Sequence, residues 1–152
     1  MNVRDKKKAV PDKPAGECHT IEHTADIGVR CKAPTLERLF ECAARAMFEI
    51  IVPPDSVEPA RAVPVAVKAP SLEELFVSWL TELLYIWESR RMLLSSFAIR
   101  KISSDALEAE VSGETYDADR HDLQSEIKAA TYHDLRIERK GDSWEVQVIF
   151  DV

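Results

Sequence analysis

The stretch VRCKAPTLERLF, residues 29–40, returns 36 residues later as VAVKAPSLEELF, residues 65–76. Eight of the twelve aligned positions are identical. Each copy passes from strand-like residues to a proline, then to a hydroxyl residue (Thr35 or Ser71), and then to leucines at helical spacing. Proline ends a strand, and threonine or serine caps the start of a helix. The repeat therefore predicts a strand-turn-helix unit that the chain uses twice.

The spacing of apolar residues predicts a long helix after each proline. Pro53-Pro54 ends the first helix, and Ser71 with Glu74 fits a capping box at the start of the second. The wide apolar stripe of the second helix is typical of core packing against a sheet, and a groove for a cofactor or partner is the alternative. The apolar positions are Leu36, Leu39, Phe40, Ala43, Met47, Ile50 and Ile51 in the first helix, and Leu72, Leu75, Phe76, Trp79, Leu80, Leu83, Leu84 and Trp87 in the second.

The second half of the chain alternates in the manner of strands. The alternation predicts strands at residues 97–102, 107–116, 129–138 and 144–151, with a turn at Lys140-Gly141-Asp142 joining the last two into a hairpin. The polar segment DADRHDLQSEI, residues 117–127, predicts a loop with a short helical turn. We expect one α+β domain over residues 17–152, in which an antiparallel or mixed β-sheet is backed by the two helices. Residues 1–16, rich in Lys, Asp and Pro, predict a disordered leader.

Composition and charge restrict the class of protein. With 152 residues, 45% of them hydrophobic, the chain can bury a core of ordinary size. A net charge of −7 argues against stable direct binding of nucleic acid, which needs clustered Lys and Arg. It favours a basic partner, a cation or simply solubility. The sequence contains neither an apolar run long enough to span a membrane nor the apolar segment of a signal peptide. We therefore expect a cytoplasmic protein.

The sequence offers little support for covalent or zinc chemistry. Cys18 and His19 are neighbours, but a catalytic pair must meet in space, and the four glycines form no phosphate-binding loop. The three cysteines lack a CxxC spacing, which indicates free thiols in a reducing compartment. His19, His23 and Asp26 have the spacing of zinc ligands. In one continuous strand, however, the histidines would face away from Asp26, so we expect ordinary hydrogen-bonded histidines.

Asp26 lies inside the strand-like stretch EHTADIGVR, residues 22–30, where aspartate is disfavoured. A second aspartate, Asp151, ends the last predicted strand, directly before Val152 and its carboxylate. If these ends meet, their oxygens suit Ca²⁺ or Mg²⁺, and without a cation the carboxylates would repel one another. Solvated carboxylates are the alternative. Lys128 is either a surface lysine or a cation that faces these carboxylates or a phosphate.

Several motifs, in order along the chain, resemble the archease family. The similarity runs from about Cys18 to Val152 and leaves the leader outside. The motifs are His23-Thr24-Ala25-Asp26, Leu36-Glu37-Arg38-Leu39-Phe40, Leu72-Glu73-Glu74-Leu75-Phe76, Glu82-Leu83-Leu84-Tyr85, Gly113-Glu114, Glu126-Ile127-Lys128-Ala129-Ala130-Thr131-Tyr132-His133 and Val148-Ile149-Phe150-Asp151-Val152.

The resemblance implies a small α+β protein that is not itself an enzyme. Archeases assist the RtcB-type RNA ligase of tRNA splicing and RNA repair, where they promote guanylylation of the ligase and repeated turnover. The resemblance implies a metal site at Asp26, Asp151 and Val152, and a lysine needed for ligase activation at Lys128. The expected cofactor is a divalent cation, first Ca²⁺ and alternatively Mg²⁺ or Mn²⁺. The oligomeric state and the RNA that is processed stay open.

Two other classes of function stay open as alternatives. A general chaperone or adaptor would use the apolar helix stripe and would not need the carboxylates. A stand-alone metal-dependent hydrolase would need an open metal position and a positioned base, for which Lys128 and His133 are the candidates.

Overall fold

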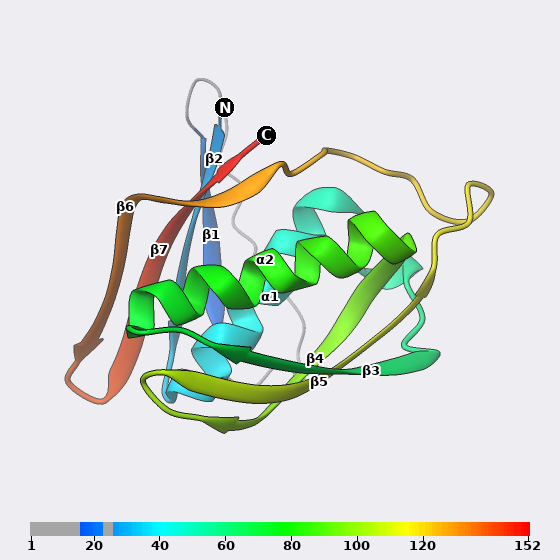
Figure 1. The fold of residues 1–152 in the computed structure, drawn as a ribbon. Helices are drawn as coiled ribbons and strands as arrows, with labels where there is room; N and C mark the ends of the chain where they lie inside the picture. Colours follow the sequence, from blue (N-terminus) through cyan, green and yellow to red (C-terminus); the bar gives the residue numbers. More distant parts are fainter. Residues whose placement is uncertain (1–15, 23–25) are drawn as a thin grey trace.

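The structure, a computed structural model, describes residues 16–22 and 26–152 (Figure 1). The predicted leader lies outside these residues except for Gly16. Over the described part, the chain forms seven strands and two α-helices, which confirms the α+β class. In chain order these are β1 (Glu17–Glu22), β2 (Asp26–Ala33), α1 (Leu36–Ile51), the short 3-10 helix η1 (Pro54–Ser56), β3 (Arg61–Lys68), α2 (Leu72–Arg90), β4 (Met92–Ile102), β5 (Ala106–Thr115), β6 (Ala129–Lys140) and β7 (Ser143–Asp151).

The strands form two sheets in which every pair of neighbours is antiparallel. One sheet has the order β1-β2-β7-β6 and the other the order β3-β5-β4. Each copy of the repeat supplies a strand to a different sheet, since β2 belongs to the first and β3 to the second. Helix α1 packs on β2 and β4, and α2 packs on β6, β3 and β4, so both helices contact both sheets (Figure 1).

Both predicted helix caps are present. The Thr35 hydroxyl oxygen accepts a hydrogen bond from the Arg38 backbone N–H at 3.2 Å, and Ser71 accepts one from the Glu74 backbone N–H at the same distance. The reciprocal contact of the capping box differs from the usual one, because Glu74 Oε1 accepts from the Ser71 hydroxyl at 3.1 Å. Each cap fixes the point where a strand ends and a helix begins.

Equivalent residues of the two repeats meet in the core. Phe40 and Phe76 have ring centroids 5.1 Å apart in an edge-to-face arrangement, and both are fully buried. The indole N–H of Trp79, also fully buried, donates to the Phe40 carbonyl oxygen at 2.9 Å. This bond satisfies a buried donor and ties α2 to α1.

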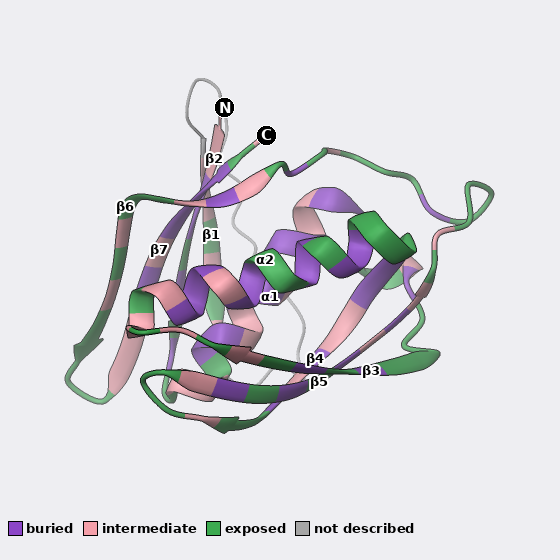
Figure 2. Ribbon diagram, in the orientation of Figure 1, coloured by how far each residue is buried: buried purple, intermediate pink, exposed green. Residues whose placement is uncertain are grey.

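The apolar stripe of α2 is buried, which confirms core packing as its role. Figure 2 shows α2 with buried positions along the side that packs on the rest of the molecule. Among the described residues, the large hydrophobic side chains that are exposed are Tyr85, Leu123 and Tyr132. Neither helix in residues 16–22 and 26–152 is long and apolar enough to cross a membrane.

Some predicted boundaries change. Strand β4 begins at Met92, not at residue 97, because a single residue, Arg91 in the left-handed conformation (φ 51°), ends α2 and starts the strand. Asp26 opens β2 and does not lie inside a continuous strand, since β1 has already ended at Glu22. The predicted turn of the last hairpin is present at residues 141–142, with Gly141 at φ 60°.

Two glycines provide a test of backbone packing. A Cβ atom at Gly113 would lie 1.7 Å from the Leu93 carbonyl oxygen of the neighbouring strand, whereas one at Gly141 would meet nothing within 4 Å. We expect Gly113→Ala to lower the free energy of unfolding by about 3 kcal/mol, because the backbone of β4 must move. Gly141→Ala should lower it by about 1 kcal/mol, from the left-handed backbone alone. Chemical denaturation measures both losses, and equal losses would contradict the close approach at Gly113.

Candidate functional site

The structure brings Asp26 and Asp151 together. Strands β2 and β7 pair antiparallel with Asp26 directly opposite Asp151, although 125 residues separate them in the chain. Directly opposed residues of an antiparallel pair project their side chains to the same face, with Cβ atoms about 5 Å apart. Figure 1 shows the end of β7 beside the start of β2, at one end of the sheet. Two carboxylates therefore share one small region.

Lys128 and Val152 lie at the same end of the sheet. The Lys128 backbone N–H donates to the Asp151 carbonyl oxygen at 2.7 Å, and Ala129 pairs with Asp151 on the side away from β2. Lys128 is exposed, whereas Val152 is half-buried and packs against the core. Asp151 thus has Asp26 on one side and the start of β6 on the other, and packing of Val152 holds the last residue in place.

These residues fit a hard divalent cation by the chemistry of their donor atoms. The carboxylate oxygens of Asp26 and Asp151 are the two candidate donors on the paired strands, with the carboxylate expected at Val152 as a third, and such cations prefer oxygen. Within residues 16–22 and 26–152, no cluster of three or more His, Cys, Asp or Glu side chains could hold a metal. A cation here would accordingly take two side chains, the terminal carboxylate and water.

The three residues considered for zinc do not form a group in the described part of the chain. His23 lies outside the described residues. Contrary to expectation, His19 does not face away from Asp26, because β1 and β2 are separate strands and His19 pairs with Arg30, on the same face as Asp26. Arg30 is four residues along β2 from Asp26. Measured along the strand direction, His19 therefore lies about 13 Å from Asp26.

A pocket of about 380 Å³ opens on the face of the first sheet that carries Arg30 and Gln147. Arg30 Nε donates to Gln147 Oε1 at 3.0 Å, and Gln147 donates in turn to the Asp134 carbonyl oxygen at 3.1 Å. His19 lines this pocket, whereas Asp26, Lys128, Asp151 and Val152 do not, and its arginines and lysines are mixed with glutamates. The pocket is therefore separate from the end of the sheet where Asp26 and Asp151 meet.

Strand β6 contains a wide bulge close to the paired aspartates. Its pairing with β7 breaks between Thr131 and Arg136, and Asp134 in the bulge is left-handed (φ 53°). Hydrogen bonds fix the bulge, since the Thr131 hydroxyl donates to the Ile149 carbonyl oxygen at 2.8 Å. Tyr132 is 57% exposed there, and His133 contacts the Asp134 carboxylate at 3.4 Å. Bulges often present side chains beside functional sites.

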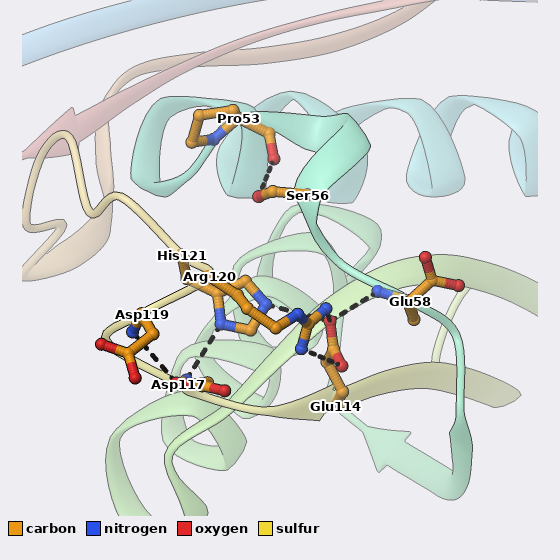
Figure 3. A network of polar contacts seen from close by, with 8 residues as sticks. All are labelled: Pro53, Ser56, Glu58, Glu114, Asp117, Asp119, Arg120 and His121. Atoms are coloured by element: carbon orange, nitrogen blue, oxygen red, sulfur yellow. Dashed lines mark hydrogen bonds and ion pairs between the residues drawn. The ribbon is translucent and has the colours of Figure 1, made fainter.

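Sequence reasoning missed the polar network that anchors the loop leading to Lys128 (Figure 3). At its centre, the Glu114 carboxylate accepts two hydrogen bonds from the Arg120 guanidinium, at 2.9 and 2.7 Å. It also accepts from the Glu58 backbone N–H at 2.8 Å and lies 2.9 Å from His121 Nε2. These contacts, led by Arg120, hold the pKa of Glu114 at about 2, below its ordinary value of 4.5.

The hydrogen bonds fix the proton of His121. This side chain is fully buried, and its Nδ1 accepts from the Asp117 backbone N–H at 3.0 Å. Nε2 therefore carries the ring proton and donates it to Glu114. An Asp117–His121 backbone bond of 2.8 Å supplies the single helical turn predicted for this loop.

Further along, the same loop is attached to α1. The Gln124 backbone N–H donates to the Ile51 carbonyl oxygen at 2.7 Å, at the end of α1, and Ile127 is buried in the core. Lys128 follows directly and joins Asp151. A glutamate near the end of a strand, followed by a loop that contains both arginine and histidine, is the signal that could have indicated this network.

Comparisons with known proteins agree with the fold and with the family that the sequence resembles. The Archease protein family matches residues 19–152. Protein archease of Methanosarcina acetivorans is 38% identical over 136 residues, covering 87% of this chain and 93% of that protein. Protein archease of Pyrococcus furiosus is 37% identical over 135 residues, covering 86% and 95%.

Solved structures share the fold. The solution structure of Methanobacterium thermoautotrophicum protein 1598 superposes with a TM-score of 0.72 at 31% identity, covering 91% of this chain and 99% of that one. The crystal structure of a Thermotoga maritima protein, described as an archease and possible chaperone, has a TM-score of 0.62 at 23% identity and covers 87% and 94%. The second likeness concerns the fold alone.

The Glu114 network predicts a pH-dependent contribution to stability. Glu114→Gln removes the charge that Arg120 and His121 contact, so we expect the midpoint of thermal unfolding near pH 7 to fall by about 5 °C. Because the folded pKa is depressed to about 2 from 4.5, the contribution is fully present above pH 4.5. It is lost as the pH falls toward 2, and the difference between the two proteins should close over that range.

The matched control is Glu110→Gln, on the same strand. Glu110 forms an exposed ion pair with Arg100 at 2.9 Å, and this substitution should change the midpoint by no more than about 1 °C. A difference between Glu114→Gln and the native chain that stays constant from pH 7 to 2 would contradict the role given to the carboxylate.

Proposed function

This chain belongs to the archease family, and on that premise we propose that it is a non-enzymatic activator of an RtcB-type RNA ligase in tRNA splicing and RNA repair. It would promote guanylylation of the ligase and so sustain multiple turnover. One observation carries the proposal: Asp26 lies directly opposite Asp151, and the backbone of Lys128 is bonded to Asp151. Two carboxylates and an exposed lysine therefore lie at one end of the sheet.

In this proposal, Asp26, Asp151 and the terminal carboxylate of Val152 hold a divalent cation, Ca²⁺ or alternatively Mg²⁺ or Mn²⁺. A bound cation would offset the repulsion between the carboxylates and supply positive charge to phosphate oxygens. Two observations support this arrangement: Asp26 and Asp151 are directly opposed in the antiparallel register, and Val152 packs against the core. The protein's part is to present these oxygens in a rigid arrangement.

Lys128 would bind a phosphate of the nucleotide in the ligase. Its backbone is fixed at both sides, by the bond to Asp151 and by the burial of Ile127, while its side chain is exposed. An ammonium group on a fixed backbone loses less conformational entropy when it binds than one on a mobile loop. The lysine can therefore reach into a partner without reorganisation of this chain.

Exposed hydrophobic side chains flank Lys128 along the chain. Leu123 precedes it by five residues and Tyr132 follows it by four, and both are exposed. Tyrosine is enriched among the residues that dominate binding energy at interfaces. The net charge of −7 would favour association with a basic ligase surface. We infer that the ligase contacts Leu123 and Tyr132 while Lys128 enters its nucleotide site.

Two observations bear on the alternatives. A general chaperone or adaptor that uses the apolar stripe of α2 would need surface that is buried between the sheets. A stand-alone hydrolase would need a positioned base, and His133 is 70% exposed on the bulge and paired with Asp134. A ligase activator, by contrast, would use Asp26, Asp151 and Lys128, which lie at the end of the sheet.

Neutralising the paired aspartates tests the proposal. Asp26→Asn and Asp151→Asn should each lower stimulation of ligase guanylylation by at least about tenfold, because a ligand oxygen of the cation loses its charge. Asp142→Asn, at the opposite end of β7, is the matched control and should stimulate like the native chain. Guanylylation of a purified RtcB-type ligase with GTP is the measurement.

Thermal unfolding gives a second readout that does not depend on the ligase. Ca²⁺ should raise the unfolding midpoint of the native chain and of Asp142→Asn, but not that of Asp26→Asn or Asp151→Asn. Full stimulation by both aspartate variants would overturn the proposed function. Normal stimulation without a Ca²⁺ effect would overturn the cation site alone.

The position of Val152 gives a separate prediction. A tag joined to Val152 removes its free carboxylate, so it should lower stimulation by about tenfold or more, whereas a tag before Met1 should have little effect. Both tagged proteins should have the same unfolding midpoint in the absence of a divalent cation. Equal stimulation by the two tagged forms would remove Val152 from the site.

A further inference from the structure

All three cysteines of the chain lie close together although they come from three different elements. Cys18 in β1 is directly opposite Cys31 in β2, and their sulfur atoms are 2.7 Å apart. The Cys18 thiol also donates to the carbonyl oxygen of Cys42 in α1, at 3.7 Å. None of the three forms a disulfide.

The backbone around Cys18 and Cys31 already has the geometry that a disulfide requires. Directly opposed residues of an antiparallel pair have Cα atoms about 4.5 to 5.5 Å apart, within the range of roughly 4.4 to 6.8 Å seen across disulfides. The bonded distance between sulfurs is about 2.05 Å, so the two atoms need to approach by about 0.6 Å. Side-chain rotation alone can supply a movement of that size.

The two thiols differ in their access to solvent. Cys31 is buried, with 2% of its surface exposed, whereas Cys18 is half-buried on β1, the edge strand of its sheet. A small oxidant in solution would thus reach the Cys18 sulfur first. Cys31 then lies within contact of any group formed on Cys18.

We propose that Cys18 and Cys31 form an oxidisable dithiol, which a peroxide converts into an intramolecular disulfide that joins β1 to β2. In the first step the Cys18 thiolate attacks one peroxide oxygen, the O–O bond breaks, and Cys18 becomes a sulfenic acid while hydroxide leaves. In the second step the Cys31 thiolate attacks the Cys18 sulfur and displaces a second hydroxide. The two thiol protons convert the hydroxides to water, so hydrogen peroxide is reduced to two waters as two thiols are oxidised to one disulfide.

The shared hydrogen bond sets the rate of the first step. Contact with Cys31 raises the pKa of the Cys18 thiol, so little thiolate is present at neutral pH. The oxidation is therefore slow near pH 7 and accelerates as the pH rises. A slow dithiol of this kind responds to sustained peroxide and not to a brief exposure.

The disulfide would constrain a specific part of the fold. It closes a loop from residue 18 to residue 31, which contains the start of β2 at Asp26. In the described residues, β1 pairs with one strand, β2, so a covalent link restrains an edge that otherwise has one neighbour. We expect the oxidised protein to unfold at a midpoint about 5 °C higher than the reduced protein.

The test uses the full chain and its three single variants, Cys18→Ser, Cys31→Ser and Cys42→Ser, each reduced and then treated with hydrogen peroxide. Thiols are counted after denaturation, intact mass is recorded, and the bond is located by peptide mapping without reduction. The native chain should fall from three thiols to one, lose the mass of two hydrogens, and yield a peptide pair that joins Cys18 to Cys31. Cys42→Ser, the matched control, should form the same bond and fall from two thiols to none.

The remaining variants assign the order of the steps. Cys31→Ser should stop at a sulfenic acid on Cys18 that a dimedone probe labels, and Cys18→Ser should form no intramolecular bond. Oxidation of the native chain should be faster at pH 9 than at pH 7. A bond that maps to Cys42, three thiols that survive peroxide, or loss of the bond in Cys42→Ser would each overturn the inference.

Discussion

The fold depends on the junction between the two helices, where Phe40 packs edge-to-face on Phe76. The Trp79 indole N–H also donates to the Phe40 carbonyl oxygen there. Phe40 and Phe76 are equivalent residues of the repeat, so the two strand-helix units contact each other through the same position in each copy. Both helices contact strands of both sheets, and this junction is where the helices hold one another. Because the rings and the indole are fully buried, the two halves cannot separate without exposing the centre of the core.

The paired aspartates are positioned by elements that this core holds in place. Strand β2 leads directly into α1, and β7 is hydrogen-bonded on one side to β2 and on the other to β6. The loop before β6 is fixed by Glu114 and by the end of α1. Among residues 26–152, the segments that carry Asp26, Lys128 and Asp151 are thus attached to a packed helix or to a central strand.

Local patterns in the sequence predicted local structure well, and long-range pairing poorly. Thr35 and Ser71 gave both helix starts because a cap depends on residues three positions apart. The pairing of Asp26 with Asp151 is a long-range contact that no periodicity contains, so the residues alone gave it only as a condition, and the family resemblance then favoured it. The Glu114 network and the Cys18–Cys31 contact were not predicted for the same reason, since each joins separate elements.

The register of β2 on β7 makes the number of residues in these strands as important as their identity. Successive side chains of a strand alternate between faces, so one residue inserted or deleted between Gly141 and Asp151 would turn the Asp151 carboxylate toward the core side. The same change would bring Phe150, now fully buried, to the solvent. Substitutions on the outer face can accumulate one at a time, whereas a change of length damages the core and the carboxylate pair together. Homologous chains should therefore vary in composition along this hairpin far more than in its length.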